Sequence, residues 1–190
     1  MTRQAEILYT TINDATLGCG KIKLNDPTIT FEFGRYNARP IDTTKLKGLR
    51  KSLEAEGQMW YRPETWLPLI IPDASWVDAN TLTKDFTKGS MMPILALTTE
   101  GQQRMASWVM ASGQHRVEAV RQILADKGKE LQLLRTEQHK TNEQNIDEGR
   151  KKAINARLEE QIKTKLADIN DLQWWGVIVY DEGESIQVHV

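Results

Sequence analysis

Four consecutive residues, Gly113-Gln114-His115-Arg116, carry the clearest chemical signal in the sequence. They follow an apolar stretch at 108–111 that is typical of a buried strand, and they open a segment in which apolar residues recur at helical spacing. A helix that begins directly after glycine presents unpaired backbone N–H groups, with the positive end of the helix dipole behind them. Cationic side chains in this first turn are unfavourable unless they share a negative ligand. The pattern predicts a phosphate site, and the simpler alternative is a turn in which Ser112 is an ordinary N-cap.

A second helix start offers matching groups. Asp42 can cap a helix in which Leu46, Leu49 and Leu53 share one face, and Lys45 lies in its first turn. If both helix starts face one crevice, several cations and N–H donors converge there. The predicted phosphate-binding or nucleotide-binding residues are Arg39, Asp42, Lys45, Gly113, Gln114, His115 and Arg116. Glu118 is the candidate catalytic carboxylate, although a surface glutamate is the commoner role.

The elements that must position these residues are predicted from apolar periodicity. We expect strands at 28–33, 67–72, 93–98, 104–112 and 174–180, with the third and fourth forming a hairpin. Pro68 and Pro72 should place the second strand near a sheet edge or keep it short. The polar segment 73–92 is expected to be an insertion or a lid, and residues 1–20 carry few signals. Gly48 predicts a close approach by another backbone or by a ligand.

The organisation expected is one domain over residues 1–190, with a core at about 21–126 and 172–190. The helix that follows Gly113 should fade at 127–129. Residues 127–171 hold ten Lys/Arg and nine Asp/Glu, with a narrow apolar stripe at Ile154, Leu158, Ile162, Leu166 and Ile169. This pattern predicts a charged helical insertion packed against the domain by one edge. The alternative is a homodimer or a protein partner that binds through residues 129–170.

Composition excludes several classes of protein. No stretch is long and apolar enough for a membrane span, and no signal-peptide pattern is visible, so we expect an intracellular protein, cytoplasmic or nuclear. Cys19 is the single cysteine, which excludes an internal disulfide and a cysteine-based zinc site, and no metal site is predicted. The net charge is −1, but residues 21–62 hold nine Lys/Arg against five Asp/Glu. This local excess keeps a DNA-binding face as an alternative.

The order of these motifs resembles the ParB/sulfiredoxin fold. The segment 42–49 resembles the Asp-x-x-Lys-x-x-x-Leu helix start of sulfiredoxins, and Asn37-Ala38-Arg39 resembles the Asn-Pro-Arg of ParB proteins. The loop 113–116 is similar to the sulfiredoxin Gly-Cys-His-Arg and to the ParB Gly-Glu-Arg-Arg. The resemblance covers residues 21–180 apart from the segments after 72 and 127. It implies an α+β fold, a small mixed β-sheet with packed helices, that binds ATP or CTP, with or without Mg²⁺.

One departure from both families concerns Gln114. It stands where sulfiredoxins have their reactive cysteine, which argues against peroxiredoxin repair, and where ParB proteins have an acid linked to CTP hydrolysis. An amide cannot take a proton in catalysis. The expected function is nucleotide binding that works as a switch, or a weak NTPase or small-molecule phosphotransferase. The alternatives are a DNA-associated module without nucleotide turnover and a ligand-free scaffold whose partners bind the helical insertion.

Overall fold

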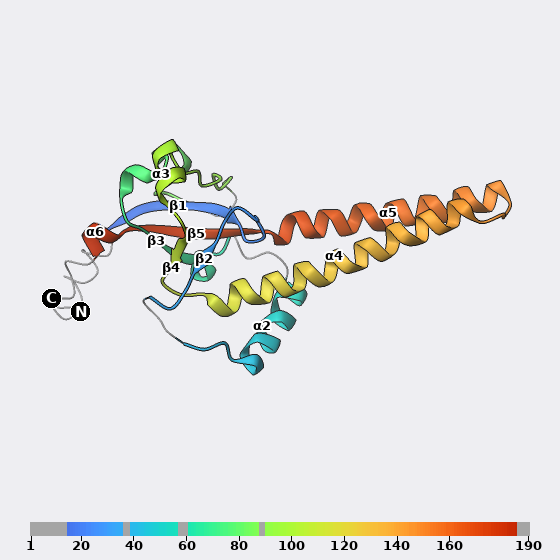
Figure 1. The fold of residues 1–190 in the computed structure, drawn as a ribbon, viewed down its shortest axis with the longest axis horizontal. Helices are drawn as coiled ribbons and strands as arrows, with labels where there is room; N and C mark the ends of the chain where they lie inside the picture. Colours follow the sequence, from blue (N-terminus) through green and yellow to red (C-terminus); the bar gives the residue numbers. More distant parts are fainter. Residues whose placement is uncertain (1–14, 36–38, 57–60, 88–89, 186–190) are drawn as a thin grey trace.

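The computed structural model describes residues 15–35, 39–56, 61–87 and 90–185 as a mixed sheet with helices packed on it (Figure 1). Chain order gives the strands and α-helices as β1 (Thr16–Lys23), β2 (Phe31–Glu32), α2 (Thr43–Glu56), β3 (Leu67–Ile71), α3 (Thr99–Arg104), β4 (Trp108–Met110), α4 (Gln114–Glu143), α5 (Glu148–Leu172), β5 (Trp174–Asp181) and α6 (Glu182–Ser185). Three short 3₁₀ helices lie at Pro63–Thr65, Ala74–Trp76 and Ala79–Thr81. The predicted α+β class with a small mixed sheet is confirmed.

The five strands are arranged in the order β1-β5-β3-β4-β2. β1 pairs with β5 and β3 pairs with β4 in antiparallel fashion, whereas β3 with β5 and β2 with β4 are parallel pairs. β3 is therefore central, not near an edge, although it is as short as its prolines predicted. Leu67, Leu69 and Ile71 alternate toward the core and are fully buried.

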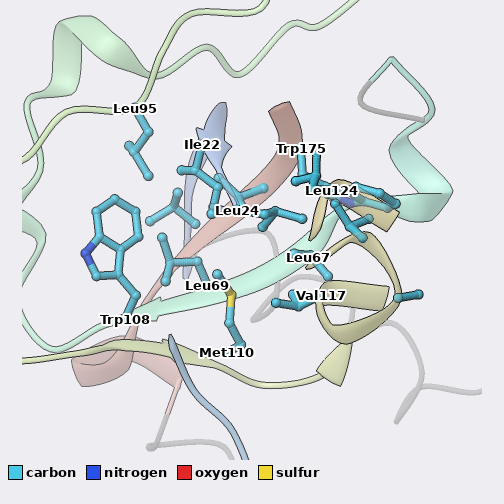
Figure 2. Close-up of a cluster of buried hydrophobic side chains, with 14 of the residues drawn as sticks. Ile22, Leu24, Leu67, Leu69, Leu95, Trp108, Met110, Val117, Leu124 and Trp175 are labelled. Atoms are coloured by element: carbon cyan, nitrogen blue, oxygen red, sulfur yellow. The ribbon is translucent and has the colours of Figure 1, made fainter. Parts of the chain in front are cut away.

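The apolar core lies between this sheet and α4 (Figure 2). Figure 2 shows Leu67 of β3 next to Val117 of α4, and Leu69 beside Met110 on the side of Trp108. All five side chains are buried. Because the β4 strand runs directly through the glycine turn into α4, burial of Met110 and Val117 fixes the position of the turn between them.

The prediction that segments 93–98 and 104–112 form a hairpin is wrong. Ile94 forms an isolated bridge with Lys21, and Leu97 forms one with Val77, so this stretch does not pair with β4. The segment between them is the helix α3, whose first turn is capped by the Thr98 hydroxyl accepting from the Gly101 N–H at 3.2 Å. A Cβ on Gly101 would lie 2.2 Å from the Trp76 carbonyl oxygen, so glycine permits this close packing.

Two further boundaries differ from the predictions. The first strand, β1, begins at Thr16, earlier than the predicted boundary at about residue 21. This part of the sequence gave few signals. The predicted strand at 28–33 is reduced to the two residues of β2. Thr83 of the segment after β3 lies along β1, where the Cys19 and Thr83 backbones exchange hydrogen bonds of 2.8 and 3.0 Å. It therefore extends the edge of the sheet.

The helical insertion is a hairpin of α4 and α5 that extends well beyond the sheet (Figure 1). α4 does not fade at 127–129 but continues through Gly128 to Glu143. Lys127 Nζ donates to Asp168 Oδ2 at 2.9 Å, and Asp147 caps α5 by accepting from the Arg150 N–H at 3.0 Å. None of the helices in the described residues has the length and apolar character that crossing a bilayer requires.

At Gly48 the structure contradicts one of the two predicted reasons for glycine, the close approach of another backbone, and gives a test. A Cβ added there would meet nothing within 4 Å, so neither another backbone nor a buried contact requires glycine at this position of α2. We expect Gly48→Ala to raise the free energy of unfolding by about 0.5–1 kcal/mol, because alanine loses less backbone entropy in a helix. Urea denaturation measures this change. An unchanged or lower stability would show that glycine has a structural role at position 48.

Candidate phosphate-binding site

A cavity of about 460 Å³ lies between the start of α4 and the start of α2. Its lining combines the loop before α4, the first turn of each helix and the end of β2. The residues that line it are Phe33, Gly34, Arg39, Lys45, Leu49, Met110, Ala111, Ser112, Gly113, Gln114, His115 and Arg116. Six of the seven predicted site residues therefore line one cavity, the exception being Asp42. None of the described residues of the 73–92 segment lines it, so these residues do not cover the site as a lid.

The start of α4 has no side-chain cap. Gly113, not Ser112, occupies the N-cap position, with φ 96° and ψ 8°, and it has no side chain to accept from the first turn. The Arg116 N–H donates to the Gly113 carbonyl at 2.8 Å. Within the described part of the chain, no acceptor contacts the N–H groups of Gln114 and His115. These two donors and the positive helix end are available to an anion in the cavity.

The Gly113 conformation is locked by packing. A Cβ at this position would lie 2.2 Å from Leu67 Cδ2, and Leu67 is fully buried in β3. The positive φ also favours glycine over any residue with a side chain. The sheet therefore holds the turn against β3 and sets the direction of the N–H groups that follow it.

His115 joins the two helix starts in a way the sequence did not predict. Its Nε2 accepts a hydrogen bond of 2.8 Å from the Asp42 backbone N–H. Nε2 is therefore occupied as an acceptor within the chain, and Nδ1 is the ring nitrogen left for other partners. The predicted contact between His115 and phosphate stays a prediction. The side chain also positions the start of α2 against α4 and can form one hydrogen bond with a ligand.

Asp42 caps the start of α2 and does not line the cavity. Its Oδ1 accepts from the Thr44 N–H at 2.9 Å and from the Lys45 N–H at 3.1 Å. These hydrogen bonds, the one from Lys45 first, hold the pKa of the Asp42 carboxyl below its ordinary value. The Thr44 and Lys45 N–H groups at the start of α2 are thus already bound by Asp42, whereas the start of α4 has no side-chain cap.

This cap predicts a pH-dependent stability. Because the pKa of Asp42 is lowered in the folded protein, its stabilising contribution is complete above the ordinary carboxyl pKa and is lost as pH falls through the lowered value. We expect Asp42→Ala to lower the urea midpoint at neutral pH, with a smaller difference from the wild type in acid. Asp42→Asn, which keeps an acceptor, should retain most of the stability at neutral pH. A difference that does not change with pH would contradict this role.

Two cationic side chains line the cavity and make few ion pairs within the described part of the chain. The Lys45 side chain is 75% exposed, and its Nζ lies 4.0 Å from Asp42 Oδ2, at the limit of an ion pair. Arg39 is exposed, and within the described residues no carboxylate pairs with it. Charges of this kind lose few existing contacts when they bind a ligand. Residues 37 and 38 of the motif that precedes Arg39 lie outside the described residues.

Arg116 has a divided role. It lines the cavity, but its Nη1 donates to the Thr65 carbonyl oxygen at 3.2 Å, which also accepts from Trp175 Nε1 at 3.0 Å. This contact ties the first turn of α4 to the loop before β3. Arg116 therefore contributes positive charge near the cavity, while part of its guanidinium serves the fold.

The proposed catalytic carboxylate is not at the cavity. Glu118 Oε1 accepts from Gln122 Nε2 at 2.7 Å, and Glu118 is not among the cavity-lining residues. Arg50 of α2 binds the same region of α4 through Gln122 and Asp126, with its Nη2 2.9 Å from Asp126 Oδ2. This surface fastens α2 to α4, which is a structural role.

Sequence reasoning missed the apolar part of the cavity, formed by Phe33, Leu49 and Met110. Leu49 was recognised only as a residue of the inward face of α2, and Phe33 only as part of a strand. No local signal distinguishes an apolar side chain that lines a cavity from one that fills a core, because both follow the same periodicity.

Three cations of the basic segment 21–62 contact neighbouring side chains in the described part of the chain. Lys21 and Lys23 lie over the Trp174 ring, with Nζ 5.2 and 5.0 Å from its centroid. Arg50 is engaged with Asp126 and lies 3.6 Å from Glu54. Several of the cations that suggested a DNA-binding face are therefore already occupied with neighbours in the chain.

The chain was compared with protein-family models, with curated proteins and with solved structures, and none of these comparisons found a match. The resemblance to the ParB/sulfiredoxin fold rests on the motifs at 37–49 and 113–116 and stays a prediction.

Proposed function

We propose that this protein binds the phosphate groups of a nucleotide, ATP or CTP, at the start of α4. The observation that carries the proposal is the uncapped first turn of α4 facing a cavity that Arg39 and Lys45 also line. Free N–H donors at a helix start favour an anion, and nearby cations add charge-assisted hydrogen bonds. Phosphate is the ligand that best uses both.

The shape of the cavity favours a nucleotide over a free phosphate ion. Its volume of about 460 Å³ is within the usual range of small-molecule sites and exceeds the space that one phosphate fills. Phe33, Leu49 and Met110 give it an apolar part beside the cationic part. A ligand that joins a planar base to a chain of phosphates matches this division.

Binding without turnover is the version that the residues support best. Among the described residues, none of those lining the cavity is an aspartate or glutamate, and Gln114 cannot act as a general base. The described residues also contain no group of three potential metal-ligating side chains, so the phosphate oxygens and water would supply most ligands of a bound Mg²⁺. A weak NTPase or phosphotransferase activity is the alternative, and measurable phosphate release would favour it.

Isothermal titration calorimetry tests the proposal. ATP and CTP, each with and without Mg²⁺, are titrated into the full chain alongside adenosine and cytidine. We expect at least one triphosphate to bind in the micromolar to millimolar range, and both nucleosides to bind at least about tenfold more weakly, because the phosphates supply the main contacts. Equal binding of nucleoside and nucleotide, or no heat at millimolar nucleotide, would refute phosphate recognition.

A further inference from the structure

The α4/α5 hairpin contains a second cavity, of about 530 Å³, on one side of the two helices. Leu133 and Leu134 of α4 supply its apolar part, and Gln161 and Thr164 are among the α5 residues that face them. None of its lining residues belongs to the phosphate site. Since the hairpin extends beyond the sheet (Figure 1), none of the five described strands covers it.

One leucine of this groove is unusually exposed. Leu133 is 70% exposed, whereas Leu131 of α4 is 9% exposed and Leu158 of α5 is 3% exposed. These two leucines are already buried within the chain, whereas Leu133 is not. Covering Leu133 would remove apolar surface from water.

Acidic residues outnumber basic residues in the lining of the groove. Its lining includes Glu130, Glu137, Glu160 and Asp168 against the single cation Lys165. Lys165 pairs with Glu130, and Lys127 pairs with Asp168. Within the described part of the chain, no cation pairs with Glu137 or Glu160. These two carboxylates lie on opposite helices and border the groove from both sides.

We propose that this groove docks an amphipathic helix of a partner protein, whose apolar stripe is flanked by lysine or arginine. A third helix in the groove between two packed helices completes a bundle and covers Leu133. Basic flanks would neutralise Glu137 and Glu160. A second copy of the same groove fits poorly, because two acidic surfaces would bring like charges together.

Two synthetic helical peptides of about five turns probe the groove. Both carry the same leucine stripe, flanked by lysine in one and by glutamate in the other, and fluorescence anisotropy measures their binding to the full chain. We expect the lysine peptide to bind at least about tenfold more tightly, and the double variant Glu137→Lys/Glu160→Lys to reverse the preference. Leu133→Asp should weaken binding of the lysine peptide about tenfold.

Leu166→Asp is the matched control, because Leu166 is 41% exposed on the hairpin and does not line the groove. It should bind the lysine peptide like the wild type, and circular dichroism checks that each variant keeps its helices. Equal binding of both peptides, or equal loss with Leu133→Asp and Leu166→Asp, would overturn the proposal. The proposal would also be overturned if sedimentation showed that the wild type is a dimer and that Leu133→Asp dissociates it. The groove would then bind a second copy of the chain.

Discussion

Neutralising Arg39 and Lys45 together, as Arg39→Gln/Lys45→Gln, should weaken nucleotide binding about 100-fold. Both side chains line the cavity, and neither is held by a close ion pair within the described residues. A charge-assisted hydrogen bond to phosphate contributes about 1.5 kcal/mol, so losing two costs about 3 kcal/mol. Calorimetric titration of each protein with the same triphosphate measures the change in Kd.

The matched control is Lys47→Gln/Lys51→Gln, which removes the same total charge, here from α2, the helix that carries Lys45. Both lysines are exposed, and neither lines the cavity. Their interaction with the ligand is a screened, longer-range attraction, so we expect a change below about threefold. If the control variant loses as much affinity as the site variant, the attraction is general to the basic surface of α2, and the site assignment is wrong.

Gly113→Ala should lower the free energy of unfolding by about 3 kcal/mol, or the melting temperature by roughly 10 °C. The left-handed backbone at φ 96° disfavours any side chain, and the new Cβ would lie 2.2 Å from Leu67 Cδ2. Because Leu67 is buried in the central strand, it has no open space into which it can move. Urea denaturation and thermal melting measure the loss.

Gly128→Ala serves as the control within the same helix. A Cβ there meets nothing within 4 Å, and the backbone is an ordinary helix. This variant should gain about 0.5–1 kcal/mol of stability, opposite in sign to Gly113→Ala. Similar small effects for both variants would mean that the turn before α4 is not locked against β3, and that the direction of its N–H groups is not fixed by packing.

Local patterns predicted the elements whose signals are internal to one segment. The stripe of Leu46, Leu49 and Leu53 gave α2, the β-branched run after Trp174 gave β5, and the glycine before Gln114 gave the start of α4. In each case one face of the element meets the core, so periodicity in the sequence reflects burial. That the two helix starts face one cavity was predicted from the cations and N–H donors they carry. Apolar periodicity gives no information on this point.

The predictions failed where tertiary contacts decide the outcome. α4 continues through Gly128 because α5 packs along it, with Lys127 bound to Asp168, and the segment alone does not show this neighbour. α3 replaced a predicted turn because Thr98 caps a short helix that packs on Trp76. β1 was missed because Gly18 and Gly20 weaken its apolar pattern, while its pairing with β5 holds it in the sheet.

The roles of the site residues show the same limit. Asp42 and His115 were predicted as ligand contacts, and the structure gives each of them a further role, since Asp42 caps α2 and His115 accepts from the Asp42 backbone. An acidic residue before a helix has the same sequence context whether it caps or binds. Only the three-dimensional arrangement shows that these two residues hold the cavity walls together while Arg39 and Lys45 face its interior.

The amide NMR spectrum of the protein tests the central claim most directly, because it observes the N–H groups that should hold phosphate. On titration with ATP, CTP and pyrophosphate, the account predicts that the Gln114 and His115 amides shift downfield with the largest changes in the spectrum. Pyrophosphate alone should produce the same pattern at higher concentration. If the nucleotide shifts other amides and leaves these two unchanged, the start of α4 is not the phosphate site.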